Sequence, residues 1–241
     1  MKIEGTKRRQ CIIYLLIDSS GSMDGEKIES VNYAIPDVLD SIKQLNDDNP
    51  EAEIKVAIMT FATDWNWVTP IPQKPEDLKI SWSDLKASGC TSLGKACDEL
   101  DRVMHRVESG GFHDDSAGAL KPGVIFITDG MPTDNYQSAL DKLKKNHWFS
   151  RAFKYCLACG DDFESEENQE VFVDLVGNKE LIHLISDDNA MKLGDYIKVV
   201  TATISKSVST IDAVEQNENI NTSDIETINE QVTSIDDLIE E

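Results

Sequence analysis

The chain has 241 residues, 40 % of them hydrophobic, which is enough for one domain with a sizeable core. Its formal net charge of −22, from 45 acidic and 23 basic residues, argues against binding to nucleic acid or to an anionic membrane surface. No apolar run approaches the roughly 20 residues of a membrane-spanning helix. The basic N-terminus precedes only a short apolar stretch without a cleavage site, so we expect a cytoplasmic protein.

Strand and helix patterns alternate along the first 208 residues. In chain order they predict a strand at residues 11–17, a helix at 28–45, a strand at 54–61, a short edge strand at 64–71 hairpinned to it, a helix at 92–107, a strand at 124–128, a helix at 136–145, a strand at 153–158, a helix at 167–176, a strand at 181–185 and a helix at 189–208. Pro36 lies inside the first helical pattern, where proline normally bends or ends a helix. This alternation predicts a doubly wound α/β fold, with a mostly parallel central sheet, one antiparallel edge strand and helices on both faces.

The composition changes after residue 208. Residues 209–241 contain no aromatic residue and no Lys or Arg, but many acidic and small polar residues. We therefore expect a domain at 1–208 and an acidic C-terminal tail at 209–241 that is flexible or loosely helical. An alternative is a partner-binding helix, since apolar residues recur there at spacings of three and four, at Ile225, Ile228, Val232, Ile235 and Ile239.

The five cysteines do not form an obvious framework. An odd number in a chain without a signal peptide argues against structural disulfides. Cys156 and Cys159 form a CxxC pair, but no second pair follows for a zinc site, and the motif ends a predicted strand rather than opening a helix. We expect ordinary buried thiols at this motif.

Three short loops carry the oxygen donors of a candidate metal site. The first follows the first strand and contributes Asp18, Ser20 and Ser22; the second precedes a helix and contributes Thr91; the third follows a later strand and contributes Asp129. Ligand sites of open α/β sheets gather at the carboxyl ends of strands, so these side chains are expected on one rim. Hard oxygen donors suit Mg²⁺, Mn²⁺ or Ca²⁺ rather than zinc.

The donor set favours binding over catalysis. With only two carboxylates among five oxygens, a bound ion keeps attraction for a carboxylate supplied by a partner protein. The same residues also fit structural roles, as a helix N-cap and turn for Asp18, Ser20 and Ser22, an N-cap for Thr91, and a turn before Gly130 for Asp129. Two other functions stay open: a Mg²⁺-dependent phosphatase-like enzyme, although Ser20 stands where such chemistry needs a second Asp, and a metal-independent scaffold acting through the acidic tail.

The segments DSSGSM, CTSLG and TDGMPTD, in this order along residues 9–208, resemble the von Willebrand factor A domain and its metal-ion-dependent adhesion site. The resemblance implies that Ser20, Ser22 and Thr91 contact the metal through hydroxyls, while Asp18 and Asp129 hold it directly or through water. A partner's Asp or Glu would complete the shell, and no catalysis is expected.

A narrower likeness is visible in RRQCIIYLLIDSSGSMDGEKIESVNYAI, VAIMTFATD, GCTSLGKACDEL and ITDGMPTD, which look like the bacterial TerY-like branch of tellurite-resistance and stress operons. This likeness implies a cytoplasmic protein whose partners include a PP2C-type phosphatase and a protein kinase. The chain departs from the branch at Cys90, where Gly is expected before Thr91, and in its acidic tail.

Overall fold

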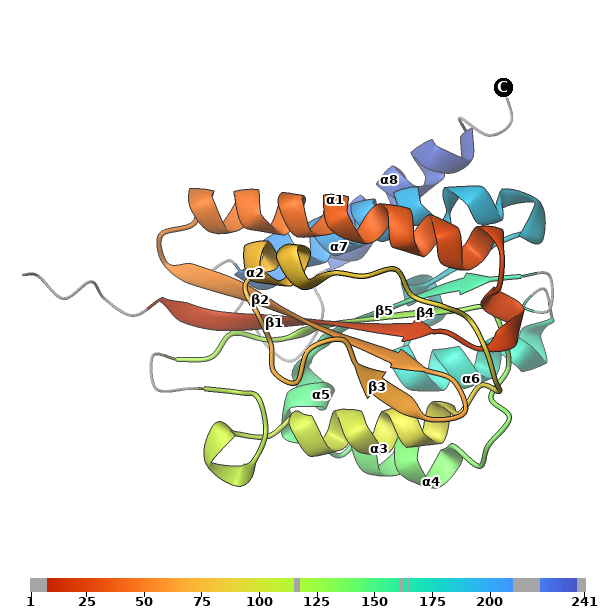
Figure 1. Ribbon diagram of the computed structural model, residues 1–241, viewed down its shortest axis with the longest axis horizontal. Coiled ribbons are helices and arrows are strands. Elements are labelled where there is room, and N and C mark those ends of the chain that lie inside the picture. Colours follow the sequence, from red (N-terminus) through yellow and green to blue (C-terminus); the bar gives the residue numbers. More distant parts are fainter. Residues whose placement is uncertain (1–7, 115–117, 161–162, 164, 210–221, 238–241) are drawn as a thin grey trace, which may run out of the picture.

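A six-stranded sheet forms the centre of the molecule, with strand order β3-β2-β1-β4-β5-β6 (Figure 1). The computed structural model describes residues 8–114, 118–160, 163, 165–209 and 222–237. The strands are β1 (Arg9–Asp18), β2 (Ala52–Phe61), β3 (Trp65–Trp67), β4 (Gly123–Thr128), β5 (Phe153–Cys159) and β6 (Ile182–Ile185). All neighbouring pairs are parallel except β2 and β3, which confirms the predicted mixed sheet with one antiparallel edge strand.

Helices cover both faces of the sheet, as the alternating pattern predicts (Figure 1). One face carries α1 (Glu26–Asp48), α2 (Pro75–Ser81) and α7 (Leu193–Ser209); the other carries α3 (Leu93–Val103), α4 (Gln137–Leu143), α5 (His147–Arg151) and α6 (Glu166–Val176). Short 3₁₀ turns occur at η1 (Gly21–Met23), η2 (Val107–Ser109), η4 (Lys179–Leu181) and η5 (Asp187–Lys192). Within the described residues, no helix is both long and apolar enough to cross a membrane.

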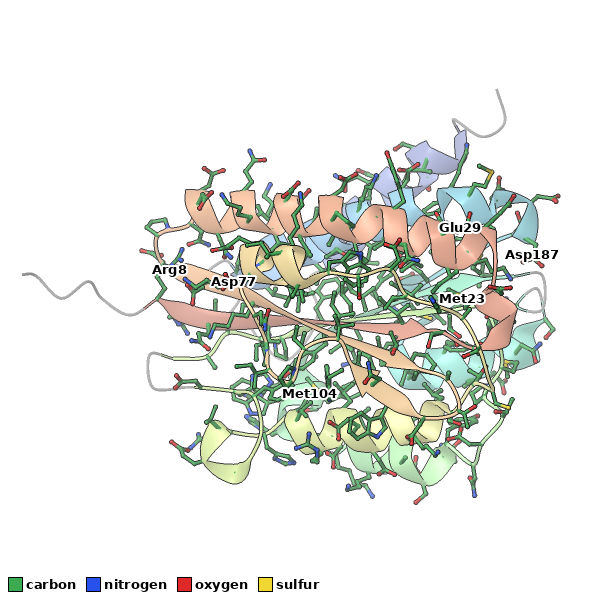
Figure 2. The ribbon with its side chains drawn as sticks, in the orientation of Figure 1. Arg8, Met23, Glu29, Asp77, Met104 and Asp187 are labelled. Atoms are coloured by element: carbon green, nitrogen blue, oxygen red, sulfur yellow. The ribbon has the colours of Figure 1, made fainter. Side chains whose placement is uncertain are left out.

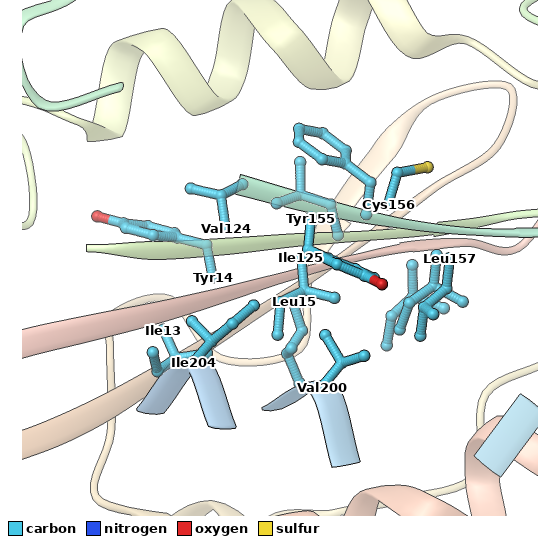
Figure 3. Close-up of a cluster of buried hydrophobic side chains, with 14 of the residues drawn as sticks. Ile13, Tyr14, Leu15, Val124, Ile125, Tyr155, Cys156, Leu157, Val200 and Ile204 are labelled. Carbon is cyan, nitrogen blue, oxygen red and sulfur yellow. The ribbon is translucent and has the colours of Figure 1, made fainter. Parts of the chain in front are cut away.

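The core lies on both sides of β1 and β4, the two central strands. Every residue of β1 from Cys11 onward is buried, as is every residue of β4. Figure 3 shows side chains of β1, β4 and β5 meeting Val200 and Ile204 of α7. This double-sided burial explains why the central strands read as continuous apolar runs.

Two short helices were not predicted, and a third helix, which was predicted, continues through a proline. The helices α2 and α5 have seven and five residues, too short for a clear periodic pattern. Asn146 is the N-cap of α5, and its side chain accepts hydrogen bonds from the backbone amides of Trp148 and Phe149. The helix α1 continues through Pro36, because its buried face packs against the sheet and α7 and outweighs a cost of about 3 kcal/mol.

The chain after residue 208 includes one described helix, α8 (Thr222–Asp237). Its apolar side chains Ile225, Ile228 and Val232 are buried, and it lies against α7. The hydroxyl of Thr203 on α7 donates a hydrogen bond of 2.8 Å to Oε1 of Gln231 on α8. The boundary at residue 208 stays a prediction, and the expectations for residues 210–221 and 238–241, Ile239 included, lie outside the described residues.

The cysteines are all free thiols. Cys156 and Cys159 are buried at β5, which confirms the expectation for the CxxC motif. Burial also raises the pKa of the Cys156 thiol well above its usual value, so it stays protonated and unreactive. Cys90 is the exposed one.

Candidate metal centre

The register of the sheet brings Asp18 and Asp129 to the same edge. The strands β1 and β4 are parallel neighbours with Ile17 opposite Ile127, so the carboxylates that follow them emerge side by side. The segment that carries Thr91 joins this edge through backbone hydrogen bonds. The amide of Gly21 donates to the Gly89 carbonyl at 3.0 Å, and the amide of Ser92 donates to the Ala62 carbonyl at 2.8 Å. All five predicted residues therefore lie on one rim at the carboxyl ends of the strands, near the labelled Met23 in Figure 2.

A glycine before Thr91 makes this arrangement possible. Gly89 has φ of +86°, and a Cβ there would lie 2.4 Å from Oγ1 of Thr63. The same Thr63 oxygen accepts a hydrogen bond of 3.1 Å from the amide of Cys90. The residue with positive φ in this loop is thus Gly89. Cys90, which stands where the TerY-like branch has Gly, does not need a positive φ, so the backbone can reach Thr91 without a glycine at position 90.

Asp18 is the buried anchor of the rim. Its side chain is fully shielded from solvent; Oδ1 accepts from the Ser20 amide at 2.8 Å, and Oδ2 accepts from Oγ1 of Thr128 at 2.7 Å. Burial raises the pKa of Asp18 to about 6, although these hydrogen bonds act in the opposite direction. A carboxylate that is costly to keep charged in this position favours a bound cation.

The serine hydroxyls link the first loop to the third. Oγ of Ser20 lies 3.1 Å from Oγ of Ser22, which donates to Oδ1 of Asp129 at 2.7 Å. A Cβ on Gly130 would lie 3.6 Å from both the Ser22 and the Thr91 hydroxyl oxygens, so these two groups border the same side of the glycine. Thr91 makes no side-chain hydrogen bond to any other residue that the structure describes.

The side chains of these residues make no helix-capping bonds, although the hydrogen bond from the Ser20 amide to Oδ1 of Asp18 fits the turn role of Asp18. The N-cap position of α1 is Gly25, and Ser20 precedes η1 without a side-chain capping bond. The first turn of α3 is capped by Asp134, whose carboxylate accepts from the amides of Gly94 and Lys95 at 3.2 and 3.3 Å. Asp134 does not cap α4, the helix that follows it, whose N-cap position is Tyr136. The side chain of Thr91 is thereby left to the rim.

Lys27 is the functional candidate that sequence reasoning missed. Its Nζ lies 2.9 Å from Oδ2 of Asp129 and 2.8 Å from Oδ1 of Asp187, which Figure 2 labels at the same edge. Burial alone would lower the pKa of Lys27, but the hydrogen bonds and charges of Asp187 and Asp129 raise it above its ordinary value, so the group stays an ammonium. One signal was available in the sequence, since a lysine in the first turn of a helix opposes the helix dipole and needs a local acidic partner.

The donor set fits a hard divalent ion. The described residues contain no cluster of three or more His, Cys, Asp or Glu side chains suited to a metal. A cation on this rim would therefore be held by carboxylate and hydroxyl oxygens, with water or another protein completing its shell. Two of these oxygens, the Ser22 and Thr91 hydroxyls, border the open side of Gly130.

Comparison with known proteins identifies the domain. The family model of the von Willebrand factor type A domain matches residues 13–199, most of the chain. The chain belongs to this family. VWA domains commonly mediate protein–protein interactions, often with a metal site.

The relatives and solved structures are distant. Over 203 residues, the VWA chain is 24 % identical to human inter-alpha-trypsin inhibitor heavy chain H4, a match that covers 82 % of this chain and 21 % of that protein. It therefore spans about a fifth of that relative's length. A von Willebrand factor type A structure from Catenulispora acidiphila is 18 % identical, with a TM-score of 0.60 over 82 % of this chain and 43 % of that one.

A mussel byssus protein bears on the choice of ion. Proximal thread matrix protein 1 is 16 % identical, with a TM-score of 0.60 over 82 % of this chain and 48 % of that one, and its structure has zinc in the MIDAS motif, the metal-ion-dependent adhesion site. At such identities the likeness shows the fold alone. It does show that a motif of this type accepts zinc in that protein, so hard donors by themselves do not exclude zinc.

Proposed function

We propose that this VWA domain binds a divalent cation through Asp18, Ser20, Ser22, Thr91 and Asp129, and that the ion binds an acidic side chain of a partner protein. The observation that carries the proposal is the linked set of oxygens on the rim. Ser20, Ser22 and Asp129 are joined by contacts of 3.1 and 2.7 Å, and the Thr91 hydroxyl borders the same side of Gly130 as the Ser22 hydroxyl.

The charge of the rim supports a binding role. Asp18, Asp129 and Asp187 supply three negative charges, and the ammonium of Lys27, which pairs with Asp129 and Asp187, offsets one of them. A divalent ion then cancels the remaining negative charge, so that an open coordination position on the ion can accept a carboxylate from outside. The hydroxyls of Ser20, Ser22 and Thr91 add coordination without adding charge. Mg²⁺ is the ion we propose, with Mn²⁺ and Ca²⁺ as the other hard candidates.

The biological setting follows from the motif resemblance. We propose a cytoplasmic protein of a bacterial tellurite-resistance or stress system, with a PP2C-type phosphatase and a protein kinase among its partners. Support comes from the four TerY-like segments that span the rim loops, including ITDGMPTD around Asp129. Nucleic acid and membrane are not proposed as partners, because the chain carries a net charge of −22.

The geometry does not favour the phosphatase-like enzyme. Among the described residues, no imidazole hydrogen-bonds to Ser20, Ser22 or Thr91, so a serine or threonine nucleophile has no adjacent base. The scaffold alternative requires only the acidic tail, and it predicts that partner binding does not depend on the rim residues.

Calorimetric titration with Mg²⁺ tests the proposal. We expect binding by the wild type, its loss in a Ser20→Ala, Asp129→Ala double variant, and no change in Ser41→Ala, an exposed serine farther along α1. Unchanged Mg²⁺ binding in the double variant would exclude the rim as the site. In a parallel phosphatase assay with Mg²⁺ or Mn²⁺, turnover abolished by Asp18→Ala would establish the enzyme instead.

A further inference from the structure

A groove of about 510 Å³ runs between the chain after β4 and the helix α6. Its apolar lining comes from Met131, Tyr136 and Val171, and its polar lining from Gln137, Asn168, Glu170 and Asp174. Figure 1 shows α4 and α6 on the same face of the sheet. The groove is thus a mixed surface, with apolar contacts between acidic and amide groups.

The groove adjoins the candidate metal centre. Met131 follows Gly130 directly, and Gly130 borders the hydroxyls of Ser22 and Thr91. Thr91, Gly130 and Phe172 of α6 also lie around one closely packed region between the rim and α6. A protein segment that places a carboxylate on the rim is therefore within reach of the groove beside α6.

The charge of the groove is negative and only partly balanced. Asp174 is engaged by Lys144, with which it forms an ion pair, and by Nε2 of Gln137 at 3.3 Å. Glu170 lies one turn earlier on α6, is exposed, and forms no ion pair with any residue in the described part of the chain. The carboxylate of Glu170 is the group most available to an incoming cationic side chain.

We propose that this groove binds the residues flanking the metal-bound acid of a partner protein, and that it selects an apolar and then a Lys or Arg side chain. The inference rests on the proposed function and names the class of partner. The apolar side chain would lie against Met131, Tyr136 and Val171, and the basic group would pair with Glu170. The chain's own tail does not fit, because residues 209–241 contain no Lys or Arg. A second copy would bring a further charge of −22 to an acidic surface.

Synthetic peptides provide the probe. Each contains one Asp, then Phe and Arg after a Gly/Ser spacer of about one to four residues, which covers a reach of roughly 3.3 Å per residue. A second set has Glu in place of Arg, and a third has Asp alone. Binding is measured by fluorescence anisotropy in Mg²⁺ for the wild type, for Glu170→Lys, and for Glu108→Lys, a charge reversal on the exposed turn η2.

We expect the wild type to bind the best Arg peptide about fivefold more tightly than its Glu counterpart, the range of a partly exposed ion pair. Glu170→Lys should reverse this preference, whereas Glu108→Lys should keep it and thereby exclude an effect of net charge alone. Mg²⁺ affinity and binding of the Asp-only peptide should be the same in all three proteins. A preference for Arg that persists in Glu170→Lys would overturn the groove proposal while leaving the metal centre intact. Absence of Mg²⁺ binding in the wild type would overturn the metal centre itself, and the groove proposal with it.

Discussion

Replacing Lys27 by methionine should tighten Mg²⁺ binding at the rim. The ammonium of Lys27 lies 2.9 Å from Oδ2 of Asp129, and 16 % of its side chain is exposed. It competes with a metal ion for the same carboxylate and repels the ion through its charge. Methionine keeps most of the aliphatic packing of the lysine stem and removes the charge.

The size of the effect follows from Coulomb's law. A cation bound to Asp129 lies roughly 5 Å from the ammonium, given a metal–oxygen distance of about 2.1 Å. With an effective dielectric constant between about 20 and 80 for this partly buried position, the repulsion between the divalent ion and the ammonium is about 2–7 kcal/mol. Its removal should lower the Mg²⁺ dissociation constant by at least roughly tenfold.

Isothermal titration of wild type, Lys27→Met, Lys27→Arg and Lys43→Met measures this effect. Lys27→Arg retains the charge and should stay within a few-fold of the wild type. Lys43→Met removes an exposed lysine from the same helix, whose ion pair with Asp47 is remote from the rim, and should have little effect. If Lys27 only maintained the structure of the rim, its substitution would weaken metal binding. An unchanged or weaker Mg²⁺ affinity in a folded Lys27→Met protein would therefore refute the electrostatic reasoning.

Two further substitutions test how the domain is held together. Ile228→Ala in α8 should lower the free energy of unfolding by about 2–4 kcal/mol, because Ile228 is fully buried, whereas Ile80→Ala at an exposed position should change it by less than about 0.5 kcal/mol. Equal small losses in chemical denaturation would show that α8 does not pack on the domain in solution. Burial, with a smaller effect from His105, lowers the pKa of His113 to about 3, so as pH falls below about 6.5 the unfolded chain takes up a proton that the folded chain does not. The free energy of unfolding therefore falls by about 2 kcal/mol between pH 7 and pH 5 because of this group. His113→Gln should remove that part of the loss. If the free energy of unfolding fell equally with pH in the wild type and in His113→Gln, His113 would not be the group responsible.

The predictable part of this protein is local in origin. The apolar runs that became β1, β2 and β4 are long and buried on both sides, so their patterns are unambiguous. The convergence of Asp18 and Asp129 was predictable for the same reason, because the carboxyl ends of parallel strands share one edge. The position of Thr91 was harder to predict, because its loop precedes a helix. Backbone hydrogen bonds from Gly21 and Ser92 hold its segment at the rim.

Apart from the short helices α2 and α5, the unpredicted features depend on residues distant in sequence. Asp134 caps α3 from 40 positions away, and Lys27 joins Asp129 to Asp187, which follows β6. Both are ion or hydrogen-bond contacts made by side chains with no periodic pattern to reveal them. The packing of α8 is another such case, because the composition of residues 209–241 indicates solvation, while burial of Ile228 against the domain depends on a surface that other elements supply.

The sequence by itself determined the class of fold and the choice of five candidate ligands, in two loops at strand ends and one loop before a helix, because each depends on hydrophobic patterning and on motif chemistry over short stretches. Only the tertiary structure decided the charge and the surroundings of the rim. Lys27 approaches Asp129 because α1 begins beside the end of β4, and the groove with Glu170 exists because α6 packs beside the chain that leaves the rim. Electrostatic balance and surface shape depend on distances between elements, and those distances are set only when the sheet and its helices assemble.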